Sequence, residues 1–239
     1  MRFFLLLVPV TSLAQSPNTQ LWFEYMLNYP FANTYNLENA FTYSTLLEEP
    51  RWRAFDYSPT IEYSLTRNVD LTVGGTFSFT VQNENYNTFE IRPVVGSRIH
   101  LTPNKRVLIR VLLRLEQRNF LNLDTDEWEN LVRPRIRAES LIPLNKQTYF
   151  EDGVWYIVAD AEWLFSGDEV GERFANRFRA RVGLGHRLAY SSRFEFIYMS
   201  QQSKSGLNED FSSSDNIFRL RYKHFLRKGK PTKMTGTGN

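Results

Sequence analysis

A regular alternation of apolar and polar side chains constrains this chain more than any other feature. In segment 71–81 the odd positions are mostly apolar and the even positions are mostly Thr or Ser. Segments 55–65, 107–118, 132–142 and 174–188 alternate in the same way. A β-strand places successive side chains on opposite faces, so each segment predicts a strand with one apolar face. Because no long segment shows a helical period of about 3.6 residues, the sequence predicts an all-β fold.

The alternation divides the chain into about eleven runs. They are 20–28, 34–45, 52–65, 70–82, 87–101, 105–119, 127–142, 148–165, 173–188, 193–202 and 216–226. Several are longer than the mean soluble strand of about five to six residues, and a membrane-spanning strand needs roughly 9–11. Bacterial single-chain barrels use an even number of strands with both chain ends in the periplasm. We therefore expect ten to twelve strands and favour twelve, with either the first two runs miscounted or a break at Glu151-Asp152-Gly153.

The connections between these runs predict how the strands are arranged. Short turns near Arg67–Asp70, Thr102–Lys105, Pro143–Lys146 and Tyr190–Ser192 alternate with longer polar segments at 82–87, 122–127, 166–172 and 202–215. Outer-membrane barrels have short periplasmic turns and longer extracellular loops. The sequence thus predicts a closed antiparallel transmembrane β-barrel of outer-membrane type over residues 15–226, with 202–215 outside the cell. Aromatic residues near strand ends, such as Trp22, Trp128 and Tyr222, resemble the interfacial girdles of such barrels. The alternative is a soluble β-sandwich whose apolar faces form its core.

The first residues have the pattern of an export signal. Arg2 is followed by an apolar stretch from Phe3 to Val10, and Ser12-Leu13-Ala14 fits a signal-peptide cleavage site. We therefore expect residues 1–14 to be removed and the mature chain to begin at Gln15 and reside in the bacterial outer membrane. Residues 227–239 contain four Lys and Arg residues, and we expect a basic, flexible periplasmic tail there.

Composition excludes several classes of protein. The chain has no Cys, so disulfides, thiolate metal sites and Cys nucleophiles are excluded. Its net charge of +3 lacks the marked basic excess of a nucleic-acid-binding protein. We expect no cofactor and no metal; the expected partners are outer-membrane lipid and, during biogenesis, the barrel-assembly machinery.

The polar faces of the predicted strands carry the distinctive chemistry. If the apolar faces meet lipid, a network of charged side chains points into the lumen: Arg92, Arg98, Arg110, Arg114, Glu116, Arg118, Arg133, Arg135, Arg137, Glu139, Glu162, Arg177, Arg179 and Arg181. Buried charges must be paired, so one interpretation is a salt-bridge lattice that fills the barrel. The other is a narrow pore in which the arginines favour anions.

Evidence for an enzyme is weaker. His100 lies on a polar face and could join a Ser and an acid, as in an outer-membrane hydrolase of lipid A or phospholipid, but no local motif supports this. His186 and His224 fall on apolar faces, and no His pair has metal-ligand spacing. Asp124-Thr125-Asp126-Glu127 could hold Ca²⁺, although a solvated acidic loop is the commoner case. We therefore expect a non-enzymatic envelope component or pore.

The sequence also resembles a known family. Trp22, Tyr25, the segment Arg114-Leu115-Glu116-Gln117-Arg118 and the segment Arg133-Pro134-Arg135-Ile136-Arg137 are similar to domain-of-unknown-function family 2490. The resemblance runs from Trp22 to about His224 and implies an outer-membrane barrel of a Bacteroidota-type envelope. It implies no catalytic residue. Many outer-membrane barrels end on an aromatic that the assembly machinery reads; Phe225 would be that residue here, although further residues follow it.

Overall fold

The protein forms a barrel of long strands. The computed structural model describes residues 18–48, 52–82, 87–103, 105–165, 176–204 and 213–226. The strands in this part of the chain are β1 (Asn18–Pro30), β2 (Tyr35–Leu46), β3 (Arg53–Ser64), β4 (Val69–Val81), β5 (Thr88–His100), β6 (Leu108–Asn122), β7 (Glu127–Pro143), β8 (Val154–Leu164), β9 (Asn176–Ala189), β10 (Ser192–Lys204) and β11 (Ser213–Phe225). The described residues include no helix long and apolar enough to cross a membrane. The signal peptide and the basic tail that the sequence predicts, 1–14 and 227–239, lie outside the described residues.

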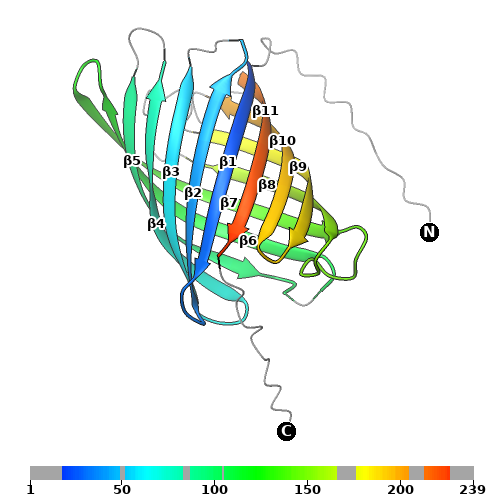
Figure 1. The fold of residues 1–239 in the computed structure, drawn as a ribbon. Coiled ribbons are helices and arrows are strands. Elements are labelled where there is room, and N and C mark those ends of the chain that lie inside the picture. Colours follow the sequence, from blue (N-terminus) through cyan, green and yellow to red (C-terminus); the bar gives the residue numbers. More distant parts are fainter. Residues whose placement is uncertain are drawn as a thin grey trace.

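The sheet closes on itself. Each strand from β1 to β11 pairs with the next in antiparallel fashion, and β1 then pairs with β11 to complete the barrel (Figure 1). This closing pair is parallel, with Asn18 opposite Asp215 and Asn28 opposite Phe225. Closure leaves no strand edge unpaired, which an open sheet of this length would have to protect.

The all-β fold class and the closed barrel predicted from the sequence are confirmed, and each of the eleven predicted runs overlaps one strand. The preference for twelve strands and the even-number rule are wrong here. A parallel closing pair lets an odd number of strands complete the barrel, so β1 begins at one rim and β11 ends at the opposite rim. The break at Glu151-Asp152-Gly153 is real, because β8 begins only at Val154, but it adds no strand. Gly153 has φ 75°, a conformation that glycine adopts readily.

The connections follow the predicted sorting by length only in part. We call the end at which β1 and β11 begin the N-terminal rim and the other end the C-terminal rim. The connection 123–126, expected to be long, is a tight turn at the N-terminal rim in which Asp126 has φ 58°. The connection 144–153, expected to be short, is the longest at the C-terminal rim. Turn residues such as Pro143 and Asn145 marked the start of this segment but not its length.

The two faces of the barrel wall differ as the alternation predicts. Large apolar side chains such as Phe41, Val73 and Leu184 lie exposed on the outer face. Charged side chains such as Glu116, Arg133 and Glu162 are buried inside. Part of the interior near the C-terminal rim is apolar and filled, by a cluster of Leu108, Leu141, Tyr149, Val154, Tyr156 and Val158. Ile197, Met199 and Ile217 are also buried inside. The rest of the interior is mostly polar, and it contains the candidate site.

Candidate functional site: the charged lumen

One large cavity runs through the barrel. Its volume is about 2310 Å³, and its lining includes Gln82 and Asn122 at the N-terminal rim and Asn33 and Pro103 at the C-terminal rim. Eight-stranded barrels are just filled by side chains, whereas sixteen or more strands leave an aqueous channel. This barrel lies between the two cases, and its cavity reaches both rims through the described residues.

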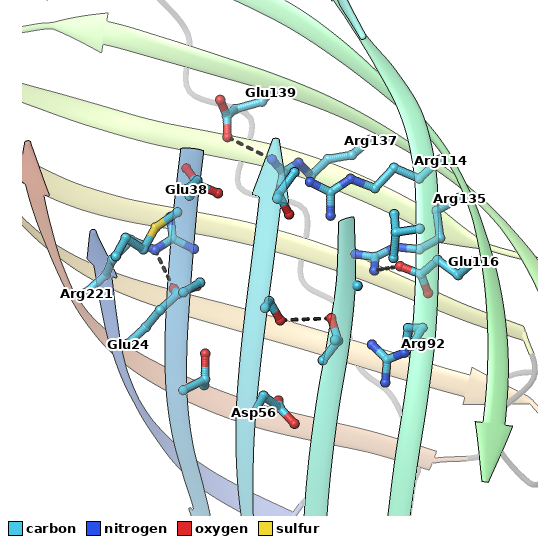
Figure 2. A pocket seen from close by; sticks show the side chains of 18 of the residues that line it. Glu24, Glu38, Asp56, Arg92, Arg114, Glu116, Arg135, Arg137, Glu139 and Arg221 are labelled. Atoms are coloured by element: carbon cyan, nitrogen blue, oxygen red, sulfur yellow. Dashed lines mark hydrogen bonds and ion pairs between the residues drawn. The ribbon is translucent and has the colours of Figure 1, made fainter. Parts of the chain in front are cut away.

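The charged residues singled out from the sequence lie inside the barrel. The cavity lining contains Arg92, Arg98, Arg110, Arg114, Glu116, Arg118, Arg133, Arg135, Arg137, Glu139, Arg177, Arg179 and Arg181. Glu162 does not line the cavity; it is only 2 % exposed and lies among the arginines that do. Figure 2 shows several of these side chains converging from different strands (Figure 2).

Glu116 on β6 joins the arginines of the neighbouring strand. It is 1 % exposed and lies opposite Arg133 in the strand register. Arg133 Nη2 donates to Glu116 Oε2 at 2.8 Å, and Arg135 Nη1 donates to the other carboxylate oxygen. The second amino group of Arg135 reaches Glu162 on β8, at 2.5 Å from Oε1. Because the two amino groups of Arg135 bond to carboxylates on both neighbouring strands, this guanidinium joins β6, β7 and β8.

The same pattern continues across β8 and β9. Glu162 Oε2 accepts from Arg181 at 3.3 Å and from Arg179 at 3.5 Å. Arg181 Nε also donates to Asp160 Oδ1 at 2.5 Å. On the other side, Glu90 of β5 accepts from Arg92 at 2.6 Å and from Arg118 at 2.7 Å. Together these pairs form what we call the arginine lattice, which extends over β5 to β9.

Several lumen residues were not on the list drawn from the sequence. Glu195, Arg219, Arg221 and Lys223 extend the lattice to the closing pair of strands. Arg221 Nε donates to Glu24 Oε2 at 2.5 Å across the parallel pair, and Lys223 Nζ donates to Glu195 at 2.9 Å. The sequence indicates the inward position of Arg219, Arg221 and Lys223, because Phe218, Leu220 and Tyr222 alternate with them and lie on the outer face.

Two aromatics lie on the inner face rather than at an outer girdle. Trp22 lines the cavity, and the guanidinium of Arg219 lies 4.5 Å from the centre of its ring. Phe225 also lines the cavity and stacks under Arg193 at 4.2 Å. Phe225 therefore does not share the outward apolar face of β11. That the assembly machinery reads Phe225 as the terminal aromatic stays a prediction.

The connection 144–153 contributes to the C-terminal rim of the cavity. Tyr149 from this connection is buried against Tyr156, with ring centres 4.7 Å apart, and accepts a hydrogen bond of 2.8 Å from Arg193. The backbone N–H of Thr148 donates to Glu151 and lowers the pKa of that carboxyl below its usual value. This connection thus narrows one end of the lumen with an ordered aromatic side chain.

The opposite wall of the lumen is built differently. The inner positions of β2, β3 and β4 are mostly Ser, Thr and Asn, and none of them is Lys or Arg. Ser58 and Thr76 hydrogen-bond to each other at 2.8 Å. Glu38 and Asp56 lie on this wall, and neither forms an ion pair with a described residue. We call this side the hydroxyl wall, and because its side chains are short it leaves room for the cavity.

The three histidines have different neighbours in the described part of the chain. His100 Nε2 lies 2.6 Å from Asp70 Oδ2 on the inner face, but no Ser or Thr hydroxyl bonds to this ring. His186 stacks on Trp155 at 4.2 Å, and His224 Nδ1 lies 3.2 Å from the hydroxyl of Tyr25.

The acidic segment 124–127 is engaged within the fold. Asp124 Oδ2 accepts from the backbone N–H of Asn87 at 2.8 Å, which ties the β6–β7 turn to the start of β5. In the described part of the chain, no group of three or more His, Cys, Asp or Glu residues could hold a metal ion. The acidic loop therefore contributes to the fold through its hydrogen bonds.

Comparison with known proteins adds one finding. A family model described as "Protein of unknown function (DUF2490)" matches residues 19–212, which is most of the chain. No curated protein matches the sequence.

Proposed function

The chain belongs to the DUF2490 family, and on that premise we propose that it is an integral outer-membrane β-barrel, exported by its first 14 residues, that acts as a narrow pore favouring anions. The observation that carries the proposal is the cavity that reaches both rims and is lined on one side by arginines. Rings of Arg or Lys favour anions in pores.

The outer face supports a lipid surrounding. Large apolar side chains are exposed around the barrel, among them Phe55, Leu115 and Phe196. Soluble monomers rarely expose apolar patches of more than a few hundred Å². The strands contain 11 to 17 residues, and a tilted membrane strand needs about 9–11. A belt of stacked aromatics, Phe194–Tyr222–Tyr25–Phe41–Tyr57, adds to this apolar outer surface.

Conductance tests the pore. Purified protein inserted into a planar bilayer under a KCl gradient is expected to give ohmic current steps. Their reversal potential should be shifted from zero towards the equilibrium potential of chloride. Arg114 lines the cavity and forms no ion pair with a described residue. In Arg114→Gln the reversal potential should therefore move towards zero, because an unpaired lumen charge is removed. Absence of conductance from protein that inserts into membranes would contradict the pore and leave a structural or accessory envelope role.

Localisation needs a separate measurement. We expect the protein to fractionate with the outer membrane, to require detergent for extraction, and to migrate differently on a gel before and after boiling. Recovery in the soluble periplasmic fraction without detergent would contradict every membrane proposal.

The second candidate is an outer-membrane hydrolase of lipid A or phospholipid, and the observation that favours it is the close pair of His100 and Asp70. A base held by a carboxylate is one part of a hydrolytic site. In this case the protein would release labelled fatty acid from lipid, and His100→Ala would not. Together with an Asp70→Asn variant that retains the fold, this result would support the hydrolase over the pore.

A further inference from the structure

Arg114 on β6 differs from the other arginines of the lattice in having no carboxylate partner. Its side chain lines the cavity, forms no ion pair or hydrogen bond with a described residue, and has a buried Nε without an acceptor there. The acid two residues along the same strand, Glu116, is bonded to Arg133 through one oxygen and to Arg135 through the other. Buried polar groups normally have hydrogen-bond partners, so the guanidinium of Arg114 calls for an acceptor that the lattice does not supply.

Arg137 on β7 is a second guanidinium with few contacts. Its ion pair in the described part of the chain is with Glu139 Oε2, at 3.5 Å, and its Nε is also buried without an acceptor. The other oxygen of Glu139 is bonded to Arg110. Arg137 therefore retains N–H donors that no described residue accepts.

The strand register places these two arginines on the same part of the wall. Arg114 lies opposite Arg135, and Arg137 is the next inward-facing residue of β7. Side chains in such diagonal positions start about 7–8 Å apart, a distance that long side chains can bridge. Arg114 is repelled electrostatically by both Arg135 and Arg137. Figure 2 shows the side chains of Arg114 and Arg137 close together in the lumen, so one small solute can contact both.

The chemistry of these donors favours one kind of ligand. A guanidinium presents its N–H groups in a planar fork that matches two oxygens of a phosphate or a carboxylate. A phosphate group on a monoester has three acceptor oxygens and a charge of about −1.5 to −2 at pH 7. It can therefore accept from both arginines and compensate both charges. A carboxylate has only two oxygens and one charge, and chloride has one charge and no match to a fork.

We propose that Arg114 and Arg137 form a binding site for a phosphate group inside the lumen. The ligand is inorganic phosphate or the phosphate of a small water-soluble monoester, because the barrel wall separates the cavity from the apolar outer face. The site deepens the proposed pore by naming the anion that it binds. It rests on that function only in requiring a lumen that solutes can enter.

Calorimetry with the folded full chain in detergent tests the site without measuring conductance. The probes are inorganic phosphate, glycerol phosphate, propionate and chloride, compared at one ionic strength. At least one of the two phosphates should bind about tenfold more tightly than propionate or chloride. Tighter binding of inorganic phosphate identifies the free ion as the ligand, and tighter binding of glycerol phosphate identifies a monoester.

Substitutions assign the donors, and the gel mobility of the unboiled barrel shows that each variant is folded. Arg114→Gln and Arg137→Gln should each weaken phosphate binding by about tenfold, because each removes one charged fork. Arg114→Lys keeps the charge but loses the fork, so it should also weaken phosphate binding.

Arg92→Gln is the matched control. Arg92 also lines the cavity, but it donates twice to Glu90, and that carboxylate keeps Arg118 as a partner when Arg92 is replaced. The substitution removes one lumen charge away from the site, so phosphate should bind as it does to the unaltered protein.

Phosphates that bind no more tightly than chloride, or an affinity that does not fall in the variants of Arg114 and Arg137, would overturn the site. An equal loss of affinity in Arg92→Gln would also overturn it, because binding would then follow the total charge of the lumen. Chloride-favouring conductance without phosphate binding would contradict the site and retain the pore. Phosphate binding without conductance would contradict the pore and retain the site.

Discussion

The arginine lattice and the hydroxyl wall lie on opposite sides of the lumen and differ in how their charged side chains are paired. On β6 to β9, long guanidinium side chains share buried carboxylates, so that Glu116 and Glu162 each contact more than one arginine. On β2 to β4, side chains are short and the acids Glu38 and Asp56 have no ion pair with a described residue. The arginine lattice therefore fills one side of the lumen, whereas the short side chains of the hydroxyl wall leave space on the other side. The free energy of unfolding is therefore expected to depend more on the arginine lattice than on the hydroxyl wall.

The largest effect on stability should follow from removing a shared carboxylate. Glu116→Gln removes the negative charge that pairs with the buried Arg133 and Arg135. Loss of one partner of a buried ion pair lowers the free energy of unfolding by about 3–5 kcal/mol. The free energy of unfolding in urea, followed by the gel mobility of the folded barrel, measures this loss. Glu38→Gln is the matched change on the hydroxyl wall and should alter stability by less than about 0.5 kcal/mol. Equal effects of the two substitutions would show that the two walls do not differ.

Local alternation explains why much of this site could be predicted. The inner positions of β6, β7 and β9 are fixed by a period of two, so Arg114, Arg135 and Arg179 could be placed inside from the sequence alone. The same rule places Arg219 and Arg221 of the last strand inside.

The features that could not be predicted from the sequence depend on contacts between distant parts of the chain. The parallel pairing of β1 with β11 joins the two ends of the barrel, and no local pattern encodes it. The inward positions of Trp22 and Phe225 follow the period of two, but their contacts with Arg219 and Arg193 are set by how the strands pair. Which carboxylate serves which arginine is likewise set by the strand register and not by the alternation itself.

A smaller loss of stability is expected when a side chain is added to the filled part of the interior. A Cβ at Gly185 on β9 would overlap the ring of Tyr156, which is fully buried and donates to Glu195 at 2.7 Å. Gly185→Ala should therefore cost about 1–3 kcal/mol, as other overpacked interiors do. At Gly75 on β4 the nearest atom to such a Cβ is Arg92 O at 3.6 Å. Gly75→Ala should leave stability unchanged or raise it slightly, and the same urea assay compares the two. Gly75 lies on the outer face between Val73 and Phe77, so a larger loss there would contradict the idea that the cost at Gly185 comes from crowding the filled interior.

The smallest effect concerns the hydrogen bond that joins β3 and β4 on the hydroxyl wall. Ser58→Ala removes the partner of the Thr76 hydroxyl at 2.8 Å, and Thr76 is largely buried. A lost neutral hydrogen bond costs about 1 kcal/mol, whereas replacing both partners with apolar groups of similar shape is close to neutral. The double variant Ser58→Ala/Thr76→Val should therefore cost less than the sum of the single variants, and a double-mutant cycle in urea measures the difference. Strict additivity would mean that water entering from the cavity satisfies both hydroxyls, and the hydroxyl wall would then be solvated rather than held by its own hydrogen bonds.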